Sequence, residues 1–413
     1  MSEIQGKIFL GRQPILDRQK KIFGYELLFR AADTLHAHIT DLAFAERSVI
    51  SNVLSTFGVS SVLGKHKGFI NVTGDLLMND MLEILPSDRI VIELLETITA
   101  TEPVLRRCRE LKDRGFLLAL DDNLYHPDYE PLYDVVDIVK IDILQASPET
   151  VLEMVKILRT RNVVLLAEKV ETTQQYLDCL SLGFQLFQGY FFARPAVLNT
   201  KRVDVAGTTL LKLLQLVCSD AEFEEIEGTF KHNPTLTYNL LRLVNSVVIG
   251  MKEKIRTLRH ALVVLGMQQL KRWVQLALFA TESAGGVGNP LLETAAIRGR
   301  LMELLSAHQR EEHTGKDYSE SAFMTGVLSL IDVLFESPME DILEQLNLTD
   351  DVRCALIHRE GHLGRLLRVA ESLESLDLSN LQKLLDESSC NLESLLEYQV
   401  QAIEWANRME EGL

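Results

Sequence analysis

The stretch FLLALDD, residues 116–122, places five apolar residues directly before two adjacent carboxylates. A short apolar run bounded by turn-forming residues predicts a buried strand, so Asp121 and Asp122 stand where that strand ends. Two like charges at the edge of a buried strand repel each other and resist the loss of water. We therefore expect this strand end to belong to a site that binds a positive group.

The same rhythm continues through the first half of the chain, where short apolar runs alternate with amphipathic stretches. This alternation is typical of β/α units around a parallel sheet. A helix is predicted over 102–115 with Gly115 at its C-cap, and another over 147–162 with Ser147 at its N-cap. So many units favour a (β/α) barrel that is irregular in its first strands. The candidate strands are 7–15, 68–72, 89–96, 116–122, 137–143, 163–168 and 184–192.

The second half of the chain has a different pattern. From Thr208 onward the leucine-rich faces follow a helical period and strand signals almost vanish. We expect an α/β barrel domain over residues 1–200 and an all-α domain over residues 201–413. The glycine-rich stretch 282–290 is predicted to be a loop between helices.

The composition excludes several classes of protein. With 413 residues, 46% hydrophobic and 24% charged, the chain can bury the cores of two soluble domains. No apolar run approaches the roughly 18 residues that cross a bilayer, and the N-terminus lacks a signal-peptide pattern, so we expect a cytoplasmic protein without a membrane partner. The net charge of −17 disfavours a nucleic-acid partner. Five cysteines without a CxxC pair indicate neither disulfides nor zinc.

Polar residues that close the apolar runs are the candidate site residues, because a (β/α) barrel carries its active site at the carboxyl ends of its strands. A single acid there is usually a helix cap or a salt-bridge partner, whereas a ring of acids needs a cation among them. The ring comprises Glu26, Asn71, Glu93, Glu96, Asp121, Asp122, Lys140, Asp142, Glu168, Glu171 and Gln188.

The ring offers oxygen ligands without histidine or cysteine, which favours Mg²⁺ or Mn²⁺ over zinc. An adjacent Asp pair suits two ions, an arrangement used to hydrolyse phosphodiesters. Lys140 has two interpretations: it serves a phosphate or the attacking water, or it only neutralises the acidic ring.

Eight short blocks, in order, resemble the EAL family, bacterial proteins with a modified (β/α) barrel that hydrolyse cyclic di-GMP to linear pGpG. The resemblance covers about residues 5–198, the whole first domain. The blocks are RQPILD (12–17), YELLFR (25–30), FINV (69–72), IELLE (92–96), ALDD (119–122), VKID (139–142), AEKVE (167–171) and FQGYFFARP (187–195).

The resemblance implies a role for each matching residue. Lys140 matches the lysine that handles the nucleophilic water, and it forms the catalytic group with Asp122 and Glu168. Glu96 and Glu171 match supporting carboxylates, and Glu96 is expected to hold the loop after the Asp pair. The residues that match the family's substrate-binding set are Gln13, Arg30, Asp142 and Gln188, with Arg30 at a phosphate. Those that match the metal-coordinating set are Glu26, Asn71, Glu93, Asp121, Asp122 and Glu168.

The chain departs from the family pattern at three places. Leu27 stands where the family motif E-A-L has alanine, which adds three carbons at a tightly packed position. The family continues its Asp pair as D-D-F-G-T-G, whereas residues 121–131 contain no glycine and include Pro127, so that loop must take another course. Lys169 replaces a glycine in AEKVE and could swing a cation toward the site.

Residues 232–274 resemble the HDOD domain, an all-α relative of the HD-domain phosphohydrolases. The resemblance rests on Pro234, LLRLVNS (240–246), the spacing from Ile255 to Gly266, and AFMTGVLSLIDVLF (322–335). Catalytic HD proteins carry a His-Asp pair in this last block, where the chain has Ser329 and Leu330. We therefore expect a non-catalytic second domain.

Five other residues of the helical half are candidate site residues. Asn245 and Ser246 could contact a ligand, although capping or interhelix hydrogen bonds explain them as well. His232 and His260 are predicted to be packing or surface residues, and Trp273 to be part of the core.

Three hypotheses on function remain open. The first is a metal-dependent cyclic di-GMP phosphodiesterase whose HDOD domain contacts a further protein partner. The second is a non-catalytic module that binds cyclic di-GMP or metal, which the altered loop after Asp122 favours. The third is a scaffold that acts in protein contacts alone. A homodimer and a monomer both remain open, because the family's dimer involves the segment that has changed.

Overall fold

Two compact units make up the chain: the first comprises residues 1–197 and the short segment 374–376, and the second comprises residues 198–373 and 377–413. In the computed structural model the described residues are 8–31, 58–121, 127–189, 205–219, 221–233, 236–238, 240–241, 257–280, 289–307, 316–335, 337–375, 381–388 and 391–412.

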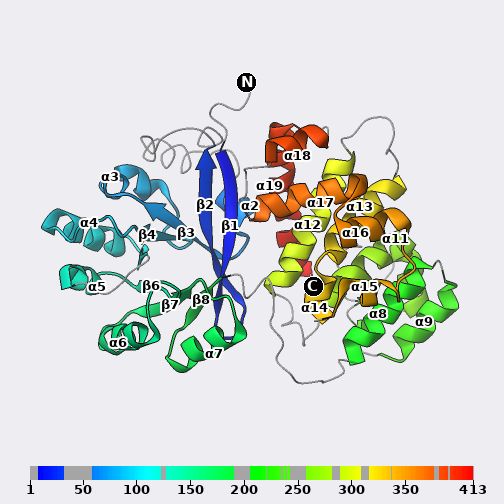
Figure 1. Cartoon of the computed structure of the whole chain (residues 1–413), viewed down its shortest axis with the longest axis horizontal. Coiled ribbons are helices and arrows are strands. Elements are labelled where there is room, and N and C mark those ends of the chain that lie inside the picture. Colours follow the sequence, from blue (N-terminus) through cyan, green and yellow to red (C-terminus); the bar gives the residue numbers. More distant parts are fainter. Residues whose placement is uncertain are drawn as a thin grey trace. The chain divides into compact units, whose positions relative to one another are not determined.

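The first unit contains a closed barrel of strands in the order β1 to β8 (Figure 1). β1 (Ile8–Asp17) pairs antiparallel with both of its neighbours, β2 (Ile22–Ala31) and β8 (Leu186–Gln188). All other neighbours pair in parallel, so the predicted barrel with irregular first strands is confirmed. The parallel strands between them are β3 (Lys67–Val72), β4 (Ile90–Leu94), β5 (Leu117–Leu120), β6 (Ile138–Asp142) and β7 (Val164–Glu168).

β2 is the strand that the pattern of apolar runs did not predict. It forms a hairpin with β1, and the turn is fixed by Asp17, whose Oδ1 accepts hydrogen bonds from the backbone N–H groups of Gln19 and Lys21 at 2.8 and 2.9 Å. Lys20 occupies the left-handed position of this turn, with φ 61°. The local hairpin carries Glu26 into the barrel without a β/α crossover.

Helices lie around the outside of the barrel in Figure 1. α6 (Pro148–Leu158) begins as predicted, because the Ser147 hydroxyl accepts a hydrogen bond from the Thr150 N–H at 3.2 Å. α4 (Glu102–Asp113) ends with Arg114 as its C-cap, and Gly115 follows with φ 93°. The remaining helical segments of this unit are α2 (Val59–Leu63), α3 (Gly74–Leu77), η3 (Asp80–Ile84), η4 (Pro127–Tyr129), α5 (Glu130–Tyr133) and α7 (Thr173–Ser181).

The barrel has one apolar layer inside and a larger one between strands and helices. Alternate residues along a strand point to opposite faces, so each strand contributes to both layers. Leu27 is 1% exposed and belongs to the outer layer. Gly68 lies close to it, since a Cβ there would stand 3.4 Å from the Leu27 side chain. The inner layer comprises Ile15, Phe69, Val91, Ala119, Ile138, Leu166 and Leu186.

The second unit is helical throughout its described residues, as predicted. Its core includes Trp273, which packs against Phe230 with ring centroids 6.0 Å apart. None of the described helices is both long and apolar enough to cross a membrane. The helices are α8 (Val205–Cys218), α9 (Phe223–Lys231), α11 (Leu258–Phe279), α12 (Pro290–Ala307), α13 (Lys316–Leu328), α14 (Ile331–Phe335), α15 (Met339–Leu343), α16 (Asp350–His358), α17 (Gly361–Glu374), α18 (Leu381–Glu387) and α19 (Leu392–Gly412).

Candidate active site

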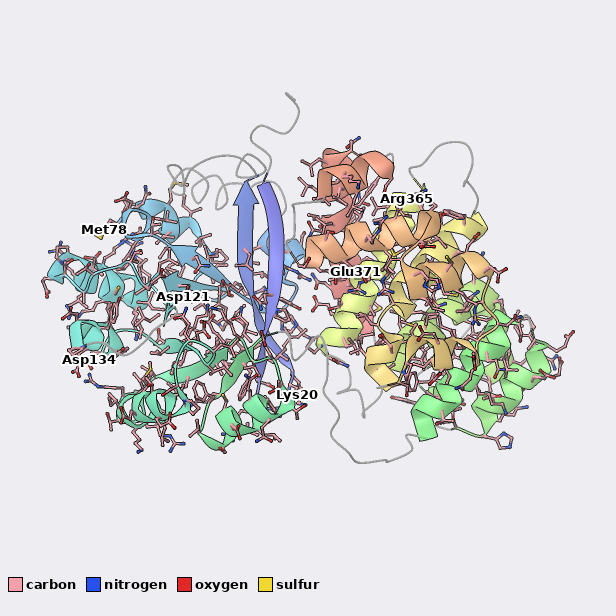
Figure 2. The ribbon with its side chains drawn as sticks, viewed as in Figure 1. Lys20, Met78, Asp121, Asp134, Arg365 and Glu371 are labelled. Carbon is pink, nitrogen blue, oxygen red and sulfur yellow. The ribbon has the colours of Figure 1, made fainter. Side chains whose placement is uncertain are left out.

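A polar layer lies directly above the inner apolar layer of the barrel. On each parallel strand from β3 to β8, the polar residue follows an apolar inner-layer residue by two positions, the repeat that returns a side chain to the same face. On the antiparallel β1 the polar Gln13 precedes Ile15 by two positions. Figure 2 shows Asp121 in the middle of the barrel unit, with Met78 and Asp134 at its outer edge. The polar layer on these parallel strands consists of Asn71, Glu93, Asp121, Lys140, Glu168 and Gln188.

The Lys140 ammonium is the centre of this layer. Its side chain is 1% exposed, and its Nζ lies 2.8 Å from Asp121 Oδ1 and 2.8 Å from Glu168 Oε1. It also pairs with Glu93 Oε1 and lies 3.5 Å from Glu26 Oε2. Four carboxylates from four strands or strand ends therefore surround one buried cation.

Glu26 joins the hairpin to the parallel part of the barrel. Its Oε1 accepts a hydrogen bond from Asn71 Nδ2 at 3.1 Å, and its Oε2 accepts one from Gln188 Nε2 at 2.6 Å. Three elements that are far apart in sequence, β2, β3 and β8, thus meet at one carboxylate.

Burial and charge act against each other in the ionisation of this cluster. Burial raises the pKa of Glu93 well above its usual range, and Lys140 offsets only part of that effect. Burial likewise raises the pKa of Glu168 to about 8, again against the pull of Lys140. For Lys140, burial lowers the pKa, but Glu93, Glu168, Glu26 and Asp121 outweigh burial and raise it. The cluster holds more negative charge than one ammonium can balance.

The donor atoms of the cluster suit a divalent cation. Four buried oxygens of this polar layer receive no hydrogen bond from the described part of the chain, a costly state unless a cation or water contacts them. All are carboxylate or amide oxygens, the ligands preferred by Mg²⁺ and Mn²⁺. In the same part of the chain no three acidic, histidine or cysteine side chains stand at metal-binding spacing, and the Lys140 ammonium lies among the carboxylates. The four oxygens are Asn71 Oδ1, Glu93 Oε2, Glu168 Oε2 and Gln188 Oε1.

A second ion pair lies beside the cluster. Asp142, at the end of β6, pairs with the ammonium of Lys169, the residue directly after β7. In the register between β6 and β7, Asp142 stands opposite Glu168. Its other oxygen accepts hydrogen bonds from the N–H groups of Leu144 and Gln145 at 2.8 and 3.2 Å. Burial raises the pKa of Asp142, but the bonds from Lys169 and the two amides outweigh burial and lower it.

Lys169 adopts a backbone conformation that is unusual for lysine. Its φ of 55° lies in the left-handed region, which costs an L-residue with a side chain about 1–2 kcal/mol. The sequence pattern had marked this position as one where a glycine is replaced, but it did not predict the pairing with Asp142. The replaced glycine was the signal that could have found it.

The described structure leaves some predicted site residues outside the cluster. Glu96 and Glu171 both have exposed side chains. Gln13 lies opposite Glu26 in the β1–β2 ladder and is half-buried. Arg30 belongs to β2, but its side chain, like the whole of Asp122, lies outside the described residues.

The loop after the Asp pair is described only from Pro127 onward, where η4 begins. Tyr129 donates a hydrogen bond from its hydroxyl to the backbone carbonyl of Glu96 at 2.8 Å. The end of this loop is therefore joined to the turn after β4 through a main-chain atom of Glu96. Residues 122–126, which the Glu96 carboxylate was expected to hold, lie outside the described part.

In the helical unit, Ser329 has a structural partner. Its hydroxyl donates to the Gly326 carbonyl at 2.7 Å and accepts from Arg298 Nη1 at 2.6 Å, with both side chains buried. Arg298 also lies 3.7 Å from Glu371. This buried network includes Ser329, one of the two residues that the resemblance sets at the place of the His-Asp pair.

The structure describes three of the other candidate residues of this unit. His232 is exposed and its Nδ1 lies 2.6 Å from the Gly228 carbonyl, while His260 is half-buried. Trp273 is 5% exposed and lies in the core. Asn245 and Ser246 lie outside the described residues.

The fold and the acidic strand ends define the class of this protein. The EAL domain model matches residues 4–195, and the HDOD domain model matches residues 208–345. A barrel with a polar mouth, followed by a helical unit, is therefore an EAL domain followed by an HDOD domain.

The chain belongs to the EAL–HDOD family of two-domain proteins, as two relatives of similar length show. It is 32% identical over 403 residues to the cyclic di-GMP phosphodiesterase CdgJ of Vibrio cholerae, covering 96% of this chain and 92% of CdgJ. It is 30% identical over 414 residues to the uncharacterized protein YuxH of Bacillus subtilis, covering 98% and 99%. Among solved structures, an EAL domain protein from Listeria monocytogenes matches with a TM-score of 0.36 and 20% identity, over 45% of this chain and 87% of that one.

Proposed function

We propose that this protein is a metal-dependent phosphodiesterase that hydrolyses cyclic di-GMP to pGpG. The observation that carries the proposal is the convergence of Glu26, Glu93, Asp121 and Glu168 on Lys140 at the mouth of the barrel. The name of the relative CdgJ, a cyclic di-GMP phosphodiesterase, supports the choice of substrate.

Mg²⁺ or Mn²⁺ is the proposed cofactor, with two ions bound. When bound, the ions would supply an activated water and stabilise the charge on the phosphate oxygens. The buried oxygens of Asn71, Glu93 and Glu168 that receive no hydrogen bond support this choice. The residues that would hold the ions are Glu26, Asn71, Glu93, Asp121, Asp122 and Glu168.

The remaining residues of the mouth would position the water and the substrate. Lys140, fixed by four carboxylates, is proposed to hold a proton at Nζ and to orient the attacking water with Asp122 and Glu168. Glu96 and Glu171 are proposed to support the neighbouring loops. The proposed substrate contacts are Gln13, Arg30, Asp142 and Gln188, with Arg30 at a phosphate.

The proposal is tested by incubating the purified full chain with cyclic di-GMP and Mg²⁺ or Mn²⁺ and separating the nucleotides. We expect pGpG from the native chain, none in excess EDTA, and none from Glu26→Ala. Glu153→Gln is the matched control, because Glu153 is an exposed acid on the outer helix α6. Hydrolysis that survives both EDTA and Glu26→Ala would contradict the proposal.

A second candidate function is a cyclic di-GMP-binding module without turnover. It is favoured by the segment after Asp121, which has no glycine up to residue 131 and contains Pro127. Turnover requires both metals at fixed spacing, whereas binding requires only the phosphate and base contacts. Metal-dependent binding of cyclic di-GMP without pGpG would establish this second function in place of the first.

The HDOD domain is proposed to pass the state of the barrel to a protein partner. We propose residues 1–200 as the barrel domain and residues 201–413 as the helical domain. A structural rather than a hydrolytic role of the helical unit is supported by the buried hydrogen bond that Arg298 donates to Ser329. A pull-down with the full chain, with and without cyclic di-GMP, measures whether a partner is bound and whether the nucleotide changes that binding.

A further inference from the structure

Lys169 stands at the mouth of the barrel, directly after the carboxylate of Glu168. Its side chain is 51% exposed, whereas the side chain of Lys140 in the same mouth is 1% exposed. The left-handed φ of Lys169 disfavours any residue with a side chain. The ion pair with Asp142 offsets this disadvantage and holds the ammonium at the end of β6.

Asp142 is fully engaged in holding Lys169 and the turn after β6. Its Oδ2 pairs with the ammonium, and its Oδ1 accepts the N–H groups of Leu144 and Gln145. The side chain is 2% exposed, so a ligand has little access to it. Asp142 is therefore placed to act on a ligand through Lys169 rather than by direct contact.

The negative charge of the mouth would repel a negatively charged ligand, and an exposed cation there would offset this repulsion. A cyclic dinucleotide carries two phosphodiester charges, and the mouth presents four carboxylates around a single buried ammonium. An ammonium has three N–H donors, so Lys169 can keep its bond to Asp142 and still donate to a phosphate oxygen.

We propose that Lys169 is a substrate-binding residue that contacts a phosphate of the cyclic dinucleotide, and that Asp142 is the positioning residue that holds it. This inference rests on the proposed function. It changes the expected role of Asp142, from a direct substrate contact to an indirect one.

The test compares cyclic di-GMP hydrolysis and binding for the native full chain and a set of variants at low and high salt. Lys169→Met should raise KM about tenfold, the effect of losing one charge-assisted hydrogen bond, while kcat stays within about twofold. The loss should shrink at high salt, because screening weakens the native contact. Lys169→Arg should restore most of the affinity. Lys156→Met, on an exposed lysine of α6, is the matched control.

A double-mutant cycle tests whether Asp142 positions Lys169 or contacts the substrate itself. Asp142→Asn should raise KM in the native background and add nothing in the Lys169→Met background, since the two residues act as one unit. Lys169→Gly removes the backbone strain, so a raised KM in a variant at least as thermally stable as the native chain excludes misfolding as the cause.

Three outcomes overturn different statements. If the native chain turns over cyclic di-GMP and Lys169→Met matches it in KM at both salt concentrations, the inference on Lys169 is wrong and the proposed function stands. If the native chain neither binds nor hydrolyses cyclic di-GMP, the proposed function is wrong and the inference falls with it. If Asp142→Asn raised KM equally in both backgrounds, Asp142 would contact the substrate directly.

Discussion

Lys140 is a residue whose stabilising role depends on what else the mouth contains. Its ammonium and the Glu93 carboxylate are both almost wholly buried, and burial of either one alone would be strongly unfavourable. The lysine therefore neutralises part of the acidic ring, and its proposed role at the attacking water is compatible with this position. The two interpretations left open by the sequence are compatible in this geometry.

Lys140→Met should destabilise the metal-free chain. It leaves four carboxylates facing each other without their shared cation, so we expect the free energy of unfolding in EDTA to fall by about 3 kcal/mol, the usual cost of breaking a buried pair. Urea unfolding of the full chain measures this change. Because Mg²⁺ can take over the neutralising role, saturating Mg²⁺ should recover much of the lost stability.

The matched variant for this prediction is Lys140→Met combined with Glu93→Gln. Burial opposes the ionisation of the Glu93 carboxyl and raises its pKa, so replacing this group with an uncharged amide should make the double variant more stable than Lys140→Met alone in EDTA. If Lys140→Met were as stable as the native chain without metal, the cation would have no neutralising role.

At the level of strands, the alternation of apolar and polar residues made most of the site predictable. The polar layer follows the inner apolar layer by two positions on each parallel strand from β3 to β8, so Asn71, Glu93, Lys140 and Glu168 could be read from short runs. β2 could not be predicted in this way, because Ile22–Ala31 starts from a hairpin turn and polar residues interrupt its apolar residues. Its turn chemistry at Asp17 was the available local signal.

The pairing of Asp142 with Lys169 was not predictable from the pattern of single strands. It depends on the register between β6 and β7, which sets Asp142 opposite Glu168, and on the left-handed backbone of Lys169. Neither is visible in the periodicity of one segment. The expected neighbours of the Asp pair, such as Glu96, depend on the course of a loop, which side-chain periodicity does not determine.

The end of β8 gives a prediction about how an element positions the site. Gly189 has φ 151°, and a Cβ on it would stand 2.2 Å from the Val170 carbonyl oxygen. Gly189→Ala should push the end of β8 away from β7 and move Gln188 from Glu26. We expect a loss of about 3 kcal/mol in the free energy of unfolding, from backbone strain and overpacking, together with reduced hydrolysis.

Gly74→Ala is the control for this change. Gly74 is the first residue of α3, and a Cβ there meets no atom within 4 Å. Its stability, measured by the same urea titration, should stay within about 1 kcal/mol of the native value, since alanine favours a helix. Equal stability of the two variants would show that the close approach of Gly189 to Val170 does not constrain β8.

Over the whole chain, the two units have separate sources of stability. The barrel concentrates its buried charge at the mouth, where a divalent cation would relieve repulsion between carboxylates. The helical unit holds its buried arginine, Arg298, through Ser329 and Glu371, without dependence on a metal. Metal should therefore stabilise one unit of the chain selectively.

Calorimetry of the full chain should show this selectivity. Mg²⁺ at about 100 times its Kd adds about 2.7 kcal/mol to the state that binds it, which raises the Tm of a unit of this size by about 5–10 °C. We expect one transition to rise on going from EDTA to Mg²⁺ and the other to stay. Arg298→Met, which removes a buried charged hydrogen bond worth about 2 kcal/mol, should lower only the transition that Mg²⁺ leaves in place. If both transitions moved together in both experiments, the units would unfold as one cooperative body, and metal binding in the barrel would be energetically linked to the HDOD domain.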